Sequence, residues 1–192
     1  MKSKLKGRGL FVFSDPAGAN SVLALIDELI LDGQRAGRDF IIYTDSKGVY
    51  PEEYSQVVNI LDFNRSDYLE IFDKHRPDYI FSGTSNTDFE HQVRILARGQ
   101  NIFTYAFIDH WTSYKQRFTF EGVTTYPDRI WVINELARVE AAEAGLPEDS
   151  LVVTSNPYYE KIRKFLPAMD RASFFIRHGI PEKKKDSSIH IR

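Results

Sequence analysis

The sequence predicts an α/β fold, a doubly wound parallel sheet of Rossmann-like type with a helical C-terminal extension. Short runs of Val, Ile and Phe without alternating polar residues recur along the chain, which is typical of strands covered on both faces. Amphipathic stretches of helical length separate these runs, and right-handed crossovers through such helices give one parallel sheet. We expect a basic leader at residues 1–8, the sheet domain at 9–156, and the extension at 157–192.

The first half of the chain supplies four of the expected strands. They are predicted at residues 9–14, 39–44, 57–61 and 78–83. Between them we expect one helix with Ala19, Val22, Leu23, Ile26 and Ile30 inward and Gly33 near its end, and a second at 66–75 with Leu69 and Phe72 inward. Arg76-Pro77 stops the second helix, because proline disfavours helical geometry in the residue before it.

The second half continues the alternation with strands at 102–108, 129–133 and 151–154. Thr87 and Glu90 match a capping box, and the helix it would open has the apolar stripe Phe89, Val93 and Leu96. Asn134 is the expected cap of a helix that ends near Gly145. Helices at 158–165 and 168–178 follow, then a charged EKKKD linker and the apolar segment SSIHIR, which is typical of the first strand of a further domain.

The composition excludes several function classes. Of the 192 residues 42% are hydrophobic and 14% aromatic, enough for one packed domain, and a net charge of −2 gives no general attraction to nucleic acid. The absence of cysteine removes disulfides and thiolate chemistry. The basic start leads into only four apolar residues, shorter than a signal sequence needs, and no run approaches the roughly 20 residues of a membrane span. Without either segment we expect a cytoplasmic protein. The histidines lack metal-binding spacing, so we expect no metal, and we expect no cofactor.

Ligands of open parallel sheets gather beyond the carboxyl ends of the strands, and four polar loops are expected there. The first, DPAGAN, contains Asp15, Gly18 and Asn20 and has neither a dinucleotide nor a P-loop fingerprint. Two interpretations stay open. Asp15 or Asn20 caps the next helix, or the glycine and the free helix amides meet a phosphate or sugar.

The second and fourth loops are shorter. GTSNT supplies Gly83, Thr84 and Ser85, whose small polar groups suit phosphate or sugar hydroxyls, while Glu90 either completes the capping box or contacts a ligand. SNP, after the last strand, adds Asn156.

The third loop, DHWTSYKQRF, holds the richest set of reactive side chains. Asp109 and His110 are candidate proton acceptors near neutral pH. Trp111 and Tyr114 offer flat faces for a sugar or base, and Arg117 has the fork geometry that holds phosphate. The alternative is that the aromatic residues anchor a long loop while the charges are solvated.

PDRIWVINELARVEAAEAGLPEDSLVVTSNPYYEKI at 127–162 and the segment FIDHWTSYKQRF resemble the N-terminal half of GT-B-fold enzymes. This class includes many glycosyltransferases and the UDP-N-acetylglucosamine 2-epimerases. The resemblance covers roughly residues 8–162. It departs from the epimerases where their G-D-T reads Gly83-Thr84-Ser85 and where their T-G-N turn reads Thr154-Ser155-Asn156.

The resemblance implies a glycosyltransferase-like acceptor-side domain of surface polysaccharide or glycan synthesis. Asp109 or His110 would accept the proton of an acceptor hydroxyl, and a nucleotide-sugar or glycan would be the ligand. A second Rossmann-like domain from another chain would complete the enzyme. Alternatives are a non-catalytic module that binds a sugar nucleotide or a protein, and, less favoured because the G-D-T acid is missing, an epimerase or hydrolase.

Overall fold

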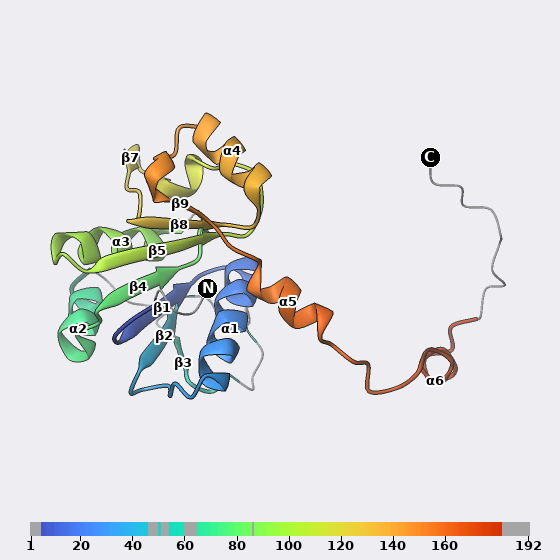
Figure 1. The fold of residues 1–192 in the computed structure, drawn as a ribbon. Coiled ribbons are helices and arrows are strands. Elements are labelled where there is room, and N and C mark those ends of the chain that lie inside the picture. The colour runs from blue at the N-terminus through green and yellow to red at the C-terminus, as the bar shows by residue number, and fades with distance from the viewer. Residues whose placement is uncertain (1–4, 46–49, 51–53, 60–64, 86, 182–192) are drawn as a thin grey trace.

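The computed structural model describes residues 5–45, 50, 54–59, 65–85 and 87–181. Within these residues a seven-stranded parallel sheet has the order β3-β2-β1-β4-β5-β8-β9 (Figure 1). Its strands are β1 (Gly9–Phe13), β2 (Phe40–Thr44), β3 (Val57–Asn59), β4 (Tyr79–Ser82), β5 (Phe103–Ile108), β8 (Arg129–Val132) and β9 (Leu151–Val153). This confirms the predicted fold class.

The strand order reverses between β1 and β4. The chain adds β2 and β3 on one side of β1, and then returns to place β4, β5, β8 and β9 on the other. In register, Gly9 lies opposite both Phe40 and Tyr79. The turn after β1 and the loop after β4 therefore leave the sheet side by side at the topological switch point, where ligands of such sheets bind.

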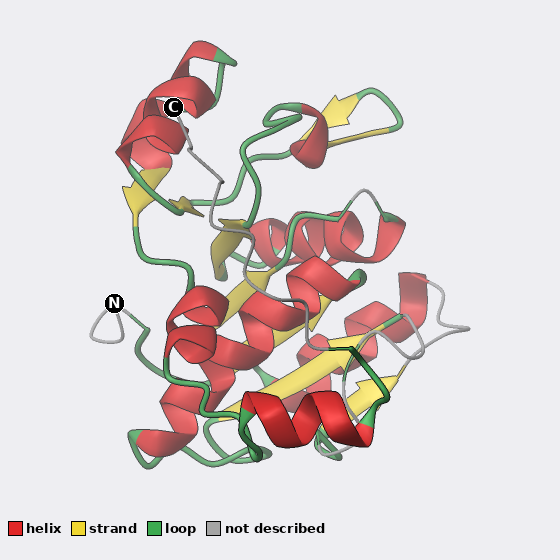
Figure 2. Ribbon diagram, turned by 90° about the vertical axis from the view of Figure 1, so that its right-hand side faces the viewer, coloured by secondary structure: helices red, strands yellow, loops and turns green. Residues whose placement is uncertain are grey.

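Helices cover both faces of the sheet (Figures 1 and 2). One face packs against α1 (Pro16–Leu31), and α5 (Pro157–Arg163) lies beside α1. The other face packs against α2 (Arg65–His75), α3 (Asp88–Gly99) and α4 (Glu135–Glu143). Successive residues of a strand point to opposite faces, so Phe11 enters the core under α1 and Val12 enters the core under α3.

A long connection joins β5 to β8 and folds against α3. It contains the short helix η2 (Gln116–Phe118) and the hairpin β6 (Thr119–Phe120) and β7 (Val123–Thr124). Phe118 is fully buried, and the ring of Phe120 lies 5.5 Å from that of His91 on α3. This connection, referred to below as the β5–β8 connection, covers side chains of α3 that would otherwise face solvent.

Several local predictions need correction or restriction. Ile30 and Leu69 were expected inward but are 43% and 40% exposed. The buried residues of α1 end at Leu29, and the buried stripe of α2 runs through Tyr68, Ile71 and Phe72. The third strand spans Val57–Asn59, and residues 60 and 61 of its predicted range lie outside the described residues. The EKKKD and SSIHIR predictions and residues 1–4 of the basic leader lie outside them as well.

The C-terminal extension is helical, as predicted, with bounds shifted by a few residues. α5 packs against α1, where Lys161 Nζ donates to Asp27 Oδ2 at 2.8 Å and to Tyr54 Oη at 2.9 Å. α6 (Arg171–Arg177) has no buried residue and stands apart from the sheet (Figure 1). None of the described helices is both long and apolar enough to cross a bilayer.

Candidate functional site

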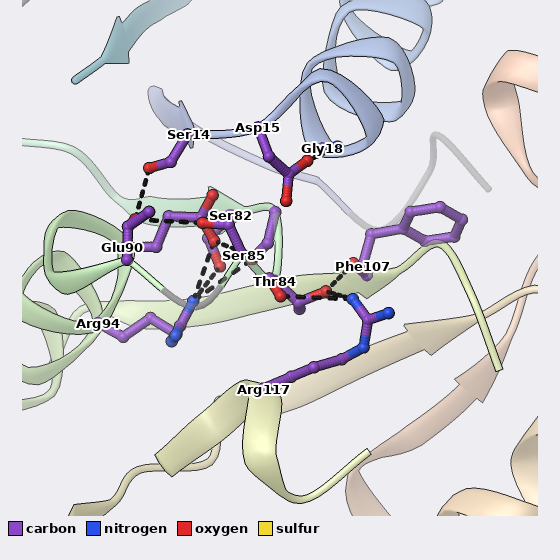
Figure 3. Close-up of polar contacts among 12 residues, drawn as sticks. Ser14, Asp15, Gly18, Ser82, Thr84, Ser85, Glu90, Arg94, Phe107 and Arg117 are labelled. Carbon is purple, nitrogen blue, oxygen red and sulfur yellow. Dashed lines mark hydrogen bonds and ion pairs between the residues drawn. The ribbon is translucent and has the colours of Figure 1, made fainter. Parts of the chain in front are cut away.

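The switch point brings together two segments, residues 14–18 after β1 and residues 83–85 and 87 after β4, called here the switch-point loops (Figure 3). Their glycines allow the backbones to touch. A Cβ built on Gly83 would lie 3.3 Å from the Cα of Gly18 and 3.0 Å from Glu90 Oε1. Any side chain at position 83 would therefore push either the start of α1 or the carboxyl group of Glu90.

Asp15 caps α1, as one of the two interpretations of the sequence predicted. Its extended backbone leads into Pro16 at the first helical position, and its Oδ1 accepts from the amide of Gly18 at 2.6 Å. Asn20 lies one turn into the helix and is half-buried. The start of α1 is thus fixed by a local contact between residues three apart.

The start of α3 is built differently, and the predicted capping box is wrong. Thr87 holds the N-cap position without a side-chain cap hydrogen bond. Its Oγ1 instead donates to Ser14 Oγ at 2.8 Å and lies 3.1 Å from Ser85 Oγ. The threonine therefore links the two switch-point loops, because a hydroxyl from β1 competes successfully with the first turn of its own helix.

The side chain of Glu90 reaches back beneath residues 83–85 and 87, the switch-point loop after β4, called below the β4 loop. Its Oε2 accepts from the amide of Ser85 at 3.0 Å, and the side chain is fully buried. Burial raises the pKa of Glu90 to about 7, and the nearby charge of Asp15 adds to the shift, whereas Arg94 and the Ser85 hydrogen bond oppose it. A carboxyl group that changes charge near neutral pH therefore lies directly below the switch-point loops.

Arg94 is the other fully buried charge of this region. Its Nη1 donates to Ser82 Oγ at 3.0 Å and to the carbonyl of Gly83 at 3.3 Å, and it lies 3.7 Å from Glu90 Oε2. Burial lowers the pKa of Arg94 to about 10, so the guanidinium is still charged at neutral pH. Its guanidinium also lies over the ring of Phe118 from the β5–β8 connection.

Asp109 and Arg117, from the two ends of the predicted reactive loop, meet at the end of β5. Arg117 Nη1 donates to Asp109 Oδ1 at 3.1 Å and to Thr84 Oγ1 at 3.0 Å. Thr84 Oγ1 in turn donates to the carbonyl of Phe107 at 3.1 Å. Asp109 and Arg117 side chains are only about one-sixth exposed, at 16% and 17%. The arginine thus ties the β4 loop to the β5 loop.

His110 and Trp111 are exposed aromatic members of the loop. Their rings stack with centroids 5.2 Å apart, and Trp111 is 50% exposed. His110 is exposed, and its Nδ1 lies 3.3 Å from Thr112 Oγ1. A stacked aromatic surface beside an imidazole is suited to contacting the apolar face and the hydroxyls of a sugar.

Tyr114 and Asn156 have structural contacts. The Tyr114 hydroxyl donates to Glu140 Oε2 at 2.8 Å, which fastens the β5–β8 connection to α4. Burial raises the pKa of Tyr114. Asn156 is buried and caps α5 by accepting from the amide of Tyr158 at 2.9 Å.

Sequence reasoning missed Ser14, Thr87 as a link between loops, His91 and Arg94. The spacing of Glu90 and Arg94, four residues apart on one helix face, was the available signal for the buried pair. His91 is fully buried, and burial lowers its pKa to about 4, so its ring is neutral. Among the residues described, no group of three or more acidic or histidine side chains is placed to hold a metal ion.

Comparison with known proteins gives matches by structure alone. No family model matches the sequence, and no curated protein matches it. The structure of S. aureus MnaA with UDP matches at a TM-score of 0.62 and 13% identity, over 91% of this chain and 52% of that one. The UDP-N-acetylglucosamine 2-epimerase from Rickettsia bellii matches at 0.63 and 12%, over 92% and 52%. The chain has the fold of the Rossmann-like N-terminal half of GT-B-type epimerases.

A third match carries a ligand in its description. It is the UDP-GlcNAc 2-epimerase from Neisseria meningitidis bound to UDP-GlcNAc, with a TM-score of 0.57 and 15% identity over 82% of this chain and 50% of that one. The chain thus spans about half the length of the structures that it matches. At identities this low the structural matches show a shared GT-B-like fold and nothing further, and this fold agrees with the resemblance seen in the sequence.

Proposed function

We propose that this chain is the acceptor-side domain of a glycosyltransferase-like enzyme of surface polysaccharide or glycan synthesis. The observation that carries the proposal is the convergence of Thr84, Asp109 and Arg117 at the carboxyl edge of the sheet, with His110 and Trp111 exposed beside them. The known binding edge of doubly wound sheets is the same edge. Trp111 supplies a sugar-stacking face there, and His110 supplies a base.

The two candidate bases of the loop have different environments. Asp109 accepts a hydrogen bond from Arg117, and this contact helps to hold the loop in place. His110 is exposed, so its ring nitrogen can take the proton of an acceptor hydroxyl. The acceptor oxygen then forms a bond to the anomeric carbon of the donor sugar, and the bond from that carbon to the nucleotide phosphate breaks. The departing nucleotide keeps the electron pair.

The donor nucleotide would be held by a second Rossmann-like domain, supplied by another chain. The length comparison supports the second domain itself, because the structures that share this fold are about twice as long as the matched region. This chain would then contribute the acceptor and the base.

A second candidate is a module that binds a sugar nucleotide without catalysis. It is favoured by the internal pairing of Asp109 with Arg117, which occupies two polar groups of the site, and by the descriptions of two structural neighbours with UDP and UDP-GlcNAc. The two candidates differ in the ligand that this chain binds alone.

Tryptophan fluorescence distinguishes the candidates, because the chain has two tryptophans and only Trp111 is exposed, while Trp131 is fully buried. For the acceptor-side domain we expect neutral oligosaccharides to change the emission and UDP-GlcNAc alone to have little effect. The variant Trp111→Phe serves as the control and should lose the response. A response to UDP-GlcNAc alone would favour the binding module, and no response to either ligand would overturn both candidates.

The role of His110 needs a separate measurement in the assembled enzyme. Together with its nucleotide-binding domain, the variant His110→Gln should lower the transfer rate by roughly 10²–10⁴-fold, as expected for loss of a general base. Rates compared at saturating oligosaccharide separate this loss from any weaker binding at the His110–Trp111 stack. An unchanged transfer rate would remove His110 from the mechanism.

A further inference from the structure

The buried pair Glu90 and Arg94 lies outside the chemistry proposed above, and both side chains hold the β4 loop from below (Figure 3). Glu90 contacts the amide of Ser85, and Arg94 contacts the carbonyl of Gly83. Thr84, which orients Arg117, lies between these two contacts in the chain. The position of this loop is therefore set by two ionisable side chains with no exposed surface.

The hydrogen bonds of the pair are incomplete. Among the described residues, Glu90 Oε1 has no hydrogen-bond partner, nor do Nε and Nη2 of Arg94, although all three atoms are buried. Glu90 Oε2 and Arg94 Nη1 are 3.7 Å apart, longer than a hydrogen bond, because each atom is used by the loop. Buried polar atoms are normally paired. The pair thus has unused donors and an unused acceptor with which a second arrangement can form.

Burial and the surrounding charges set the pH at which Glu90 changes its protonation state. Arg94 on the same helix favours ionisation of Glu90, and Asp15 at the start of α1 opposes it. His91 is neutral. The β5–β8 connection adds no charge here, because it places the ring of Phe118 against Arg94 and the ring of Phe120 against His91. The pKa of Glu90 is about 7 under these influences, so the carboxyl group titrates near neutral pH.

We propose that Glu90 is a positioning residue and that loss of its proton switches the β4 loop between two arrangements. With Glu90 neutral, Ser85 donates to Oε2 and Arg94 is free to hold the Gly83 carbonyl. When the carboxyl group releases its proton to solvent, the carboxylate attracts the unused guanidinium N–H groups of Arg94. The arginine then turns away from Gly83, and the loop that carries Thr84 moves with it.

The proposal does not depend on the proposed function, because the movement occurs in the chain without ligand. Its test is an NMR titration of ¹⁵N- and ¹³C-labelled full-length chain between pH 5 and 9. The Glu90 carboxyl carbon and the amides of Gly83, Thr84 and Ser85 should titrate with one shared midpoint close to neutral pH. Failure of oligosaccharide binding would leave this result unaffected.

Three variants separate a switch from a passive structural contact. Glu90→Gln keeps the shape of the side chain and should abolish the shared titration of the loop amides while the rest of the spectrum stays folded. Asp15→Asn keeps the cap of α1 but removes a negative charge, so the midpoint should fall. Asp88→Asn, an exposed acid in the first turn of the same helix, is the matched control and should leave the midpoint where it is.

Two results would overturn the proposal. One is a loop whose amides do not titrate between pH 5.5 and 8.5 while Glu90 does. The other is a loop titration that persists in Glu90→Gln. If Glu90→Gln does not fold, Asp15→Asn still decides the matter, because a midpoint of the loop amides that does not follow that of the Glu90 carboxyl contradicts the coupling.

Discussion

Helices α1 and α3 flank the same switch point but are buried with different chemistry. The buried residues of α1 are apolar or small, from Gly18 to Leu29. The buried face of α3 includes Glu90, His91 and Arg94 beside Phe89 and Val93. Both helices begin at the carboxyl edge of the sheet, so position alone does not explain the difference.

The covering element explains how α3 holds its charges. The sheet lies against α1, and their facing side chains form an aromatic and aliphatic core, while α5 contacts α1 through the Lys161–Asp27 ion pair. On α3 the β5–β8 connection supplies Phe118 to Arg94 and Phe120 to His91. Burial of apolar side chains contributes a stability that does not depend on pH, whereas burial of ionisable groups under a loop contributes one that does. Four variants test this contrast.

The largest effect is expected for Arg94→Met, which removes the counter-charge of a buried carboxylate. We expect a loss of about 3–5 kcal/mol in the free energy of unfolding by urea at pH 8. At pH 6 the loss should be smaller, because Glu90 is largely neutral there. Arg98→Met on the same helix, at an exposed position, should cost less than about 1 kcal/mol.

The counterpart on α1 is Leu25→Ala at a fully buried position, with an expected loss of about 2–5 kcal/mol. Because no charge is involved, the loss should be equal at pH 6 and pH 8. A loss that differs between the two pH values by as much as that of Arg94→Met would contradict the contrast between the helices.

The next effect concerns how the free energy of unfolding depends on pH, to which Glu90 and His91 contribute with opposite sign. The pKa of Glu90 is raised by folding, so its stabilising contribution is present below about pH 4.5 and is lost as pH rises through about 7. The pKa of His91 is lowered, so its contribution is present above about pH 6.5 and is lost as pH falls through about 4. In the natural chain the two slopes largely offset each other between pH 4.5 and 6.5.

Single variants should expose each slope in turn. Glu90→Gln should lose stability as pH falls from 6.5 to 4, because only the His91 contribution remains, and His91→Phe should gain stability as pH falls from 7 to 4.5, because only the Glu90 contribution remains. Each change is on the order of 3 kcal/mol, set by the size of the pKa shift. Urea denaturation at half-unit pH steps measures both. Parallel slopes in the two variants would show that these groups do not control the pH dependence.

A smaller effect is expected at the start of α1. Asp15→Ala removes the hydrogen bond to the Gly18 amide and should cost about 1 kcal/mol. Asp15→Asn retains an acceptor and should cost only a few tenths of a kcal/mol.

Thr87→Ala should have no helix-capping component, because the Thr87 side chain caps nothing. Its cost should depend on whether Ser14 is also replaced. Double-mutant analysis of Ser14→Ala and Thr87→Ala checks that coupling.

The smallest effect is expected in α6, which has no buried residue. Phe174→Ser should change the free energy of unfolding by less than about 0.5 kcal/mol, as at other surface positions. Lys161→Met, in the contact of α5 with Asp27 and Tyr54, should cost more than Phe174→Ser. The reverse ranking would mean that α6 packs against the domain in solution.

The contrast between α1 and α3 also marks how far sequence reasoning reached. The Asp15 cap depends on residues three apart, and it was predictable because such contacts form within one turn. The hydrogen bond between Ser14 and Thr87 joins residues 73 apart and followed no local rule. For the same reason Thr87 and Glu90 match a capping box in sequence and do not form one in the fold. The prediction that Leu69 is buried was wrong by one position, because Tyr68 occupies the buried face of α2.

The amino-acid sequence by itself determined the parallel sheet, its helices and the identity of the loops at its carboxyl edge. Hydrophobic periodicity acts over a few residues, so these features are written locally in the chain. Only the tertiary structure decided that Arg117 joins Asp109 to Thr84, and that Glu90 and Arg94 are buried under the β5–β8 connection. Those contacts depend on the reversal of strand order between β1 and β4 and on the return of a distant loop, which bring together side chains that no local pattern relates.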